Sequence, residues 1–250
     1  MKRVAVTAVL LSMAMLLMLA PAAMGDQITI TRIGGYYTGN GGEFNITPLS
    51  GALPGTLGSY NSLAIVGGGF ESFCLEVNEH IGIPETVNFA VSPSAIQGGL
   101  GPSGDPISIG TALLYSKFAA GILPGYTYLG LGRPASAGAL QNAIWMLEGE
   151  VAWNGSNAFI GYLLSPTGGG FASQVAAQAS ANGAYKVAVL NDTIPSTGGR
   201  RQDMLVLLPP PPIPSAADVV VPEPASMMLL GTGLLTLLGA RHFRRKFRKS

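Results

Sequence analysis

Few residues of this 250-residue chain have the chemistry of a nucleophile or a general base. The sequence holds one cysteine, Cys74, and two histidines, His80 and His242. A strand predicted over residues 70–80 would place Cys74 and His80 about 20 Å apart, because each extended residue advances about 3.3 Å. That separation is too long for a Cys/His hydrolase, and no Gly-x-Ser-x-Gly turn supplies a serine nucleophile. A conventional hydrolase is therefore not the expected class.

A second kind of chemistry needs only a thiol and an amide. In the strand predicted around Cys74, period-two alternation turns Phe73, Leu75 and Val77 to one face. Cys74 and Glu76 face the other way, and the glutamate carboxylate disfavours the thiolate form of the cysteine. The simplest interpretation is a buried free cysteine that packs as a small hydrophobic side chain.

The amide is that of Gln141, in a helix predicted over residues 137–150. Leu140 lies on the core stripe of this helix, and Trp145 lies one turn from Gln141 on the adjacent face. A cysteine sulfur can attack a glutamine amide carbon with loss of ammonia, which leaves a thioester that acylates an amine or a hydroxyl. Trp145 would shield such a bond from water. Cys74 and Gln141 are therefore the candidate thioester pair, and no other catalytic residue is expected.

The segments that must position these side chains form strand-rich flanks around a helical middle. Strands are predicted at residues 27–33, 43–47, 70–80, 86–91, 185–190 and 203–208. Helices are predicted at residues 109–120, 137–150, 157–164 and 171–181. Because strands do not alternate with helices, this order favours an α+β fold for residues 26–208 over a parallel α/β sheet. No dinucleotide-binding glycine motif and no EF-hand loop occur, so neither a cofactor nor a metal ion is expected.

The N-terminus has the three parts of a cleavable secretory signal peptide. Lys2 and Arg3 precede an apolar run at residues 4–20, and small residues follow at 21–25. We therefore expect an exported chain whose mature form begins near Asp26. Residues 26–221 carry six bases and twelve acids, a net charge of −6. A body of this sign repels phosphate backbones, so nucleic acid is not an expected partner.

The C-terminus combines a linker, a short apolar helix and a basic tail. Prolines make the linker at residues 209–220 stiff. Residues 225–240 are uncharged. As a transmembrane helix they span about 24 Å, and snorkelling side chains can cover the difference from a hydrocarbon core of roughly 30 Å. The basic residues after the helix hold the tail in the cytoplasm and leave the body outside; they are Arg241, Arg244, Arg245, Lys246, Arg248 and Lys249.

The order of these C-terminal parts resembles a known sorting signal. Residues 221–226 read Val-Pro-Glu-Pro-Ala-Ser, and the apolar helix and arginine cluster follow. This arrangement is similar to the PEP-CTERM signal, which is cut by an exosortase, a membrane cysteine protease. The resemblance implies recognition of Pro222, Glu223 and Pro224, an anchored inner-membrane precursor, and later release to the cell surface or the medium. Such tails have also been labelled as part of ice-binding proteins, but the body has no Thr-x-Thr array beyond residues 29–31, so ice binding is not expected.

The body resembles a second family, the Cys-Gln thioester domain of surface adhesins, over about residues 70–208. Residues 73–75, Phe-Cys-Leu, match the aromatic-Cys-aliphatic motif of that family. Residues 140–145, Leu-Gln-Asn-Ala-Ile-Trp, match its motif Thr-Gln-x-Ala-Ile/Val-Trp, except that leucine replaces threonine. Two later segments are similar to its closing strands, residues 185–191 and 202–206. The resemblance implies that Cys74 and Gln141 join autocatalytically.

Three functions remain open on this basis. The first is an exported surface or extracellular-matrix protein with a structural or adhesive role, processed by an exosortase-like protease and associated with exopolysaccharide or biofilm. The second is a covalent adhesin in which a thioester between Cys74 and Gln141 acylates surface amines. The third is an exported hydrolase.

Overall fold

The computed structural model describes residues 26–50, 69–96 and 104–208 of the chain. The expected signal peptide at residues 1–25, the linker at 209–220 and the sorting segment at 221–250 lie outside these residues. Within the described ranges, no helix is long and apolar enough to cross a membrane.

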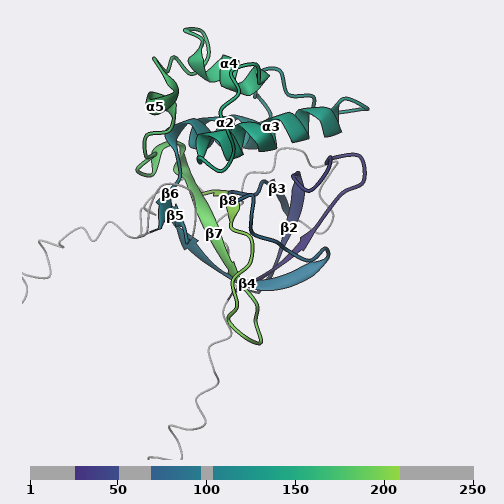
Figure 1. Ribbon diagram of the computed structural model, residues 1–250. Helices are drawn as coiled ribbons and strands as arrows, with labels where there is room; N and C mark the ends of the chain where they lie inside the picture. The colour runs from purple at the N-terminus through teal and green to yellow at the C-terminus, as the bar shows by residue number, and fades with distance from the viewer. Residues whose placement is uncertain (1–25, 51–68, 97–103, 209–250) are drawn as a thin grey trace, which may run out of the picture. The chain divides into compact units, whose positions relative to one another are not determined.

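Antiparallel strands form a six-stranded sheet in the order β3-β2-β1-β4-β7-β8 (Figure 1). Their bounds are β1 Gln27–Thr31, β2 Phe44–Ser50, β3 Phe70–Ser72, β4 Glu85–Ser92, β7 Val187–Thr193 and β8 Met204–Leu207. Strand β1 follows the period-two pattern, because Ile28 and Ile30 are buried while the residues between and beside them are half-buried. A smaller two-stranded sheet pairs β5 Ser94–Ala95 with β6 Asp105–Pro106.

The two edges of the larger sheet meet, and Cys74 lies where they join. An isolated antiparallel bridge pairs Cys74 with Met204 of β8. On either side of it, Leu75 N–H donates to the Asp203 carbonyl at 3.1 Å, and Leu205 N–H donates to the Phe73 carbonyl at 3.2 Å. The chain after β3 therefore leaves β2 and pairs with β8, which satisfies backbone groups that two open edges would leave unpaired.

The helices lie together on one side of the sheet in the view of Figure 1. They are α2 Ile109–Ala119, α3 Arg133–Leu147, α4 Ala158–Leu164, α5 Gln174–Ala177 and the 3-10 helix η1 Ala184–Lys186. Ser108 caps α2 by accepting a hydrogen bond from Thr111 N–H at 3.1 Å, and Asn157 caps α4 in the same manner. Pro134 occupies the first turn of α3, where the N–H that proline lacks would have no partner in the helix.

Two clusters of buried apolar side chains lie on opposite faces of the segment that carries Cys74. Phe73 and Leu75 belong to the larger cluster, which they share with α2 and α3. Cys74 belongs to the smaller cluster, with Ile28 and Ile30 of β1. The predicted alternation is confirmed for Phe73, Cys74 and Leu75, so the cysteine is separated from its two apolar neighbours. It does not extend to Val77, which lines a cleft together with Cys74 and Glu76.

The body is a mixed α+β structure, as predicted, but several predicted elements are wrong in extent. The strand predicted over residues 70–80 ends at Ser72, because the chain changes partner from β2 to β8 there. Tyr185 and Lys186 are not in a strand, since their φ angles of 58° and 55° are left-handed. The helix predicted over 171–181 shrinks to the four residues of α5. Helix α3 begins at Arg133, four residues before its predicted start at residue 137.

Candidate functional site

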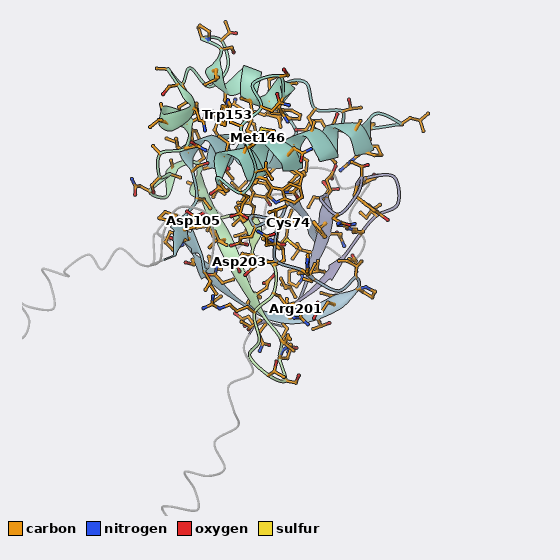
Figure 2. The ribbon with its side chains drawn as sticks, viewed as in Figure 1. Cys74, Asp105, Met146, Trp153, Arg201 and Asp203 are labelled. Carbon is orange, nitrogen blue, oxygen red and sulfur yellow. The ribbon has the colours of Figure 1, made fainter. Side chains whose placement is uncertain are left out.

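The structure brings Cys74 and Gln141 into direct contact, although 67 positions separate them in the chain. The Gln141 amide pairs with the backbone of Cys74: Nε2–H donates to the Cys74 carbonyl at 2.8 Å, and Oε1 accepts from Cys74 N–H at 3.1 Å. Figure 2 shows Cys74 below the helices, at the level of the strands. Both predicted site residues therefore belong to one site, at the junction of α3 with the closing seam of the sheet.

A third hydrogen bond completes the environment of the amide. Gly42 N–H also donates to Gln141 Oε1, at 3.2 Å. The carbonyl oxygen thus faces two backbone donors, from Gly42 and Cys74, which is the arrangement that stabilises an oxyanion during acyl transfer. No sequence pattern pointed to Gly42, because its role comes from the path of the loop between β1 and β2.

Close approach of that loop to α3 depends on two glycines. A Cβ on Gly41 would lie 2.5 Å from Gln141 Cγ, and a Cβ on Gly138 would lie 2.4 Å from Thr38 Cγ2. Any larger side chain at either position would push the loop away from the helix. The two glycines therefore permit the loop to bring Gly42 N–H onto the Gln141 carbonyl.

The N-terminal end of α3 is held over the sheet by a buried ionic network. Arg133, 1 % exposed, donates from Nε to Glu43 Oε1 at 2.8 Å and from Nη2 to Glu43 Oε2 at 2.5 Å. Nη2 also donates to Glu71 Oε1 at 2.7 Å, and Nη1 donates to the Tyr128 carbonyl at 2.5 Å. Tyr126 donates its hydroxyl to Glu43 as well. Because Glu43 precedes β2 and Glu71 lies in β3, this network sets the position of α3, and of Gln141 on it, relative to the sheet.

The thiol and the amide are both shielded from bulk water. Cys74 is 4 % exposed and Gln141 is 1 % exposed. Burial raises the pKa of the Cys74 thiol; the Arg32 guanidinium opposes this shift, and the Glu76 carboxylate adds to it. The resting cysteine is consequently a neutral thiol.

A cleft of about 660 Å³ opens onto the pair. Cys74, Gln141 and Trp145 line it together with the polar residues Glu76, Glu79 and His80. Trp145 packs against the cluster that contains Cys74, and its Nε1–H has no hydrogen-bond partner within the described part of the chain. The cleft provides a route by which a small group could reach the Gln141 carbon.

The prediction that one strand holds Cys74 and His80 apart is wrong. It relied on a continuous strand from residue 70 to residue 80, and that strand ends at Ser72. Both residues line the same cleft. The described residues contain no hydrogen bond between them, and His80 is exposed.

Comparison with protein families matches one part of the chain. Residues 220–246 match the PEP-CTERM protein-sorting motif. The matched span includes Pro222, Glu223 and Pro224, and the basic residues Arg241, Arg244, Arg245 and Lys246. Comparisons with curated proteins and with solved structures give no match. The motif implies an exported, membrane-processed protein that an exosortase recognises.

Proposed function

We propose that this exported protein is a surface adhesin that attaches covalently through an internal thioester between Cys74 and Gln141. The observation that carries the proposal is the hydrogen-bonded pairing of the Gln141 amide with the backbone of Cys74, with Gly42 N–H as a second donor to the same oxygen. These bonds also satisfy buried backbone groups of residue 74, which need partners whatever side chain stands there. The proposal rests on their further consequence, that they hold the amide beside the one cysteine of the chain.

The arrangement favours attack at the amide carbon. As Cys74 Sγ bonds to Gln141 Cδ, the carbonyl oxygen gains negative charge and is stabilised by the two backbone N–H groups that already contact it. In serine proteases one such donor contributes on the order of 10²-fold or more to the rate. The thiol proton passes to the departing nitrogen, so the products are one thioester and one ammonia. Nothing is oxidised or reduced.

The product is an acyl donor that waits for a nucleophile. A primary amine that enters the cleft attacks Gln141 Cδ, the carbon–sulfur bond breaks, and Cys74 regains its thiol as an amide forms. The burial of both residues protects the bond from hydrolysis, and Trp145 closes one side of the cleft. Each chain can react once, so the protein is a single-use acylating agent and does not turn over substrate.

Leucine at position 140 does not argue against this chemistry. In the family that the body resembles, a threonine stands there. Leu140 is fully buried in the helical core of this protein. The amide of Gln141 is held by backbone groups of Cys74 and Gly42 and needs no hydroxyl from the neighbouring side chain.

Mass spectrometry of the full chain tests the thioester. The wild-type chain should be one ammonia lighter than its sequence, and iodoacetamide should not alkylate it. Methylamine should then add to Gln141 and make Cys74 available for alkylation. Cys74→Ala and Gln141→Ala should each have the unmodified mass of their own sequence, whereas Asn142→Ala, next to Gln141 on the exposed face of α3, should retain the mass deficit. A wild-type chain of full mass with a thiol that alkylates only on unfolding would leave Cys74 as a packing residue.

Sorting to the cell surface, in a matrix of exopolysaccharide, is the second half of the proposal. The motif at residues 220–246 supports sorting by an exosortase. Deletion of residues 222–250 should remove both the cleavage signal and the anchor, so the body should leave the membrane fraction of the native host. Replacement of Pro222, Glu223 and Pro224 by alanine should instead retain an uncut precursor in the membrane. Equal distribution of all three forms between membrane and medium would contradict this role of the tail.

A further inference from the structure

Carboxylates from distant parts of the chain converge beside the thioester site. Glu76 and Glu79 follow Cys74, and Asp203 immediately precedes β8. One oxygen of each carboxylate lies within 4.8 Å of the others. Oxygens that coordinate Ca²⁺ lie about 2.3–2.6 Å from the ion, and therefore at most about 5 Å from one another. The spacing of the three oxygens thus fits a single cation.

The two glutamates of this carboxylate cluster have unused acceptor oxygens. Glu76 is buried; its Oε2 accepts from Gln202 Nε2–H at 3.3 Å, but its Oε1 has no hydrogen-bond partner among the described residues. Glu79 Oε2 also has none there. A buried carboxylate oxygen without a donor is costly. The Glu76 and Glu79 side chains also lie close enough to share a proton, so these atoms call for either a proton or a cation.

Positive side chains do not neutralise the cluster. The ion pairs within the described ranges are those of Arg133 and Arg201, and none includes a member of the cluster. Arg200 acts electrostatically on Glu79 and Asp203 without pairing with either. One guanidinium against three carboxylates leaves an excess of negative charge.

A fourth acidic residue, Asp192, adds to the buried negative charge near the carboxylate cluster. It lies on β7, is fully buried, and neither of its carboxylate oxygens has a hydrogen-bond partner in the described part of the chain. By strand alternation its side chain shares a face with Ala188 and Leu190, which pack in the same cluster as Cys74. The carboxylate that acts most strongly on it is that of Asp203, and Glu79 contributes too. Asp192 therefore adds buried negative charge that acts on the cluster, although it does not belong to the group of three.

We propose that Glu76, Glu79 and Asp203 bind a Ca²⁺ ion, with Asp192 as additional negative charge beside it. The donors are all hard carboxylate oxygens, the type that Ca²⁺ prefers and that zinc sites rarely use alone. Glu79 is half-buried and, like Glu76, lines the cleft, so an ion can enter and complete its shell with water. The other means of neutralising this cluster is protonation: burial and then the neighbouring Asp203 and Glu79 raise the pKa of Glu76 to about 10.

Calcium titration of the full chain, purified in a mild detergent, separates these possibilities. Relative to EGTA, Ca²⁺ at a hundredfold excess over its dissociation constant should raise Tm by roughly 5–10 °C. Isothermal calorimetry should give one site per chain. Glu79→Gln and Asp203→Asn should each remove most of the Tm response. Glu79 is the more informative position, because it is partly exposed and its amide variant should fold.

Two controls make the result specific. Glu150→Gln removes a carboxylate that is close to Glu76 but outside the cluster, and a glutamine can still accept the hydrogen bond from Val77 N–H, so the calcium response should persist. Cys74→Ala should also respond, because the site does not require the thioester. An equal response in wild type and Glu79→Gln, or no calorimetric binding to wild type, would overturn the proposal and leave protonation as the means of neutralisation.

Discussion

Replacement of Arg133 by alanine should destabilise the folded body by about 3–5 kcal/mol, the usual cost of removing one partner from a buried ion pair. The guanidinium is the hydrogen-bond donor to both Glu43 and Glu71, and all three side chains are buried. Without it two carboxyl groups remain in the interior with no cation. The pKa of Glu71 is already about 8, raised by burial and by Glu43 and lowered by Arg133. Removal of Arg133 should raise it further.

The destabilisation should grow with pH. In the variant, the folded-state pKa of Glu71 lies even further above its unfolded value than in wild type, so the neutral acid favours the folded state at low pH. This contribution is complete below the unfolded pKa and is lost as pH rises through the folded one. Urea unfolding between pH 5 and 9 should therefore place the two chains closest at the acidic end. This range runs from just above the ordinary pKa of a glutamate to just above the raised pKa of Glu71, about 8.

Arg201→Ala is the matched control. Arg201 pairs with Glu85 at 2.7 Å, but the two side chains are 31 % and 19 % exposed. A partly solvated pair of this kind contributes about 0–1 kcal/mol. A loss of stability in Arg133→Ala no larger than that in Arg201→Ala would mean that the buried network does not position α3.

Loss of the thioester should be the second large effect. The bond would link the closing seam of the sheet to α3 and close a loop of 67 positions. By analogy with a disulfide across a loop of this size, the link restricts the unfolded chain and contributes on the order of 4 kcal/mol. Cys74→Ala should therefore unfold at a much lower urea concentration than wild type. If Cys74 is a free thiol, the same change should cost only about 1 kcal/mol.

Methylamine offers a control that leaves the sequence unchanged. Opening the thioester of the wild-type chain with methylamine should lower its stability nearly to that of Cys74→Ala, and the same treatment should not affect Cys74→Ala itself. Gln141→Ala is less discriminating, because it also removes three hydrogen bonds and leaves buried backbone groups unpaired, at a cost of about 1–3 kcal/mol with or without a thioester. Identical unfolding curves before and after methylamine would exclude a cross-link.

Much of the candidate site could be predicted from local sequence patterns. Alternation around Cys74 separated it from Phe73 and Leu75, and helical periodicity put Leu140 in the core with Gln141 on an adjacent face. The structure agrees on each point. These predictions succeeded because the direction of a side chain within one strand or helix depends only on the repeat of that element. The sorting segment was readable for a similar reason, since its motif, apolar run and basic tail follow one another directly along the chain.

The sequence by itself did not determine which residues from distant segments contact each other after folding. The strand after Phe70 ends early because Cys74 pairs with Met204, 130 positions away, and no local pattern specifies that partner. The second donor to the Gln141 carbonyl comes from Gly42, through a loop that two glycines allow to approach α3. The carboxylate cluster likewise joins Glu76 and Glu79 to Asp203 across the closure of the sheet. Sequence patterns determined which way Cys74 and Gln141 point. Tertiary closure decided what they face, because strand pairing and loop docking depend on contacts between segments that periodicity does not connect.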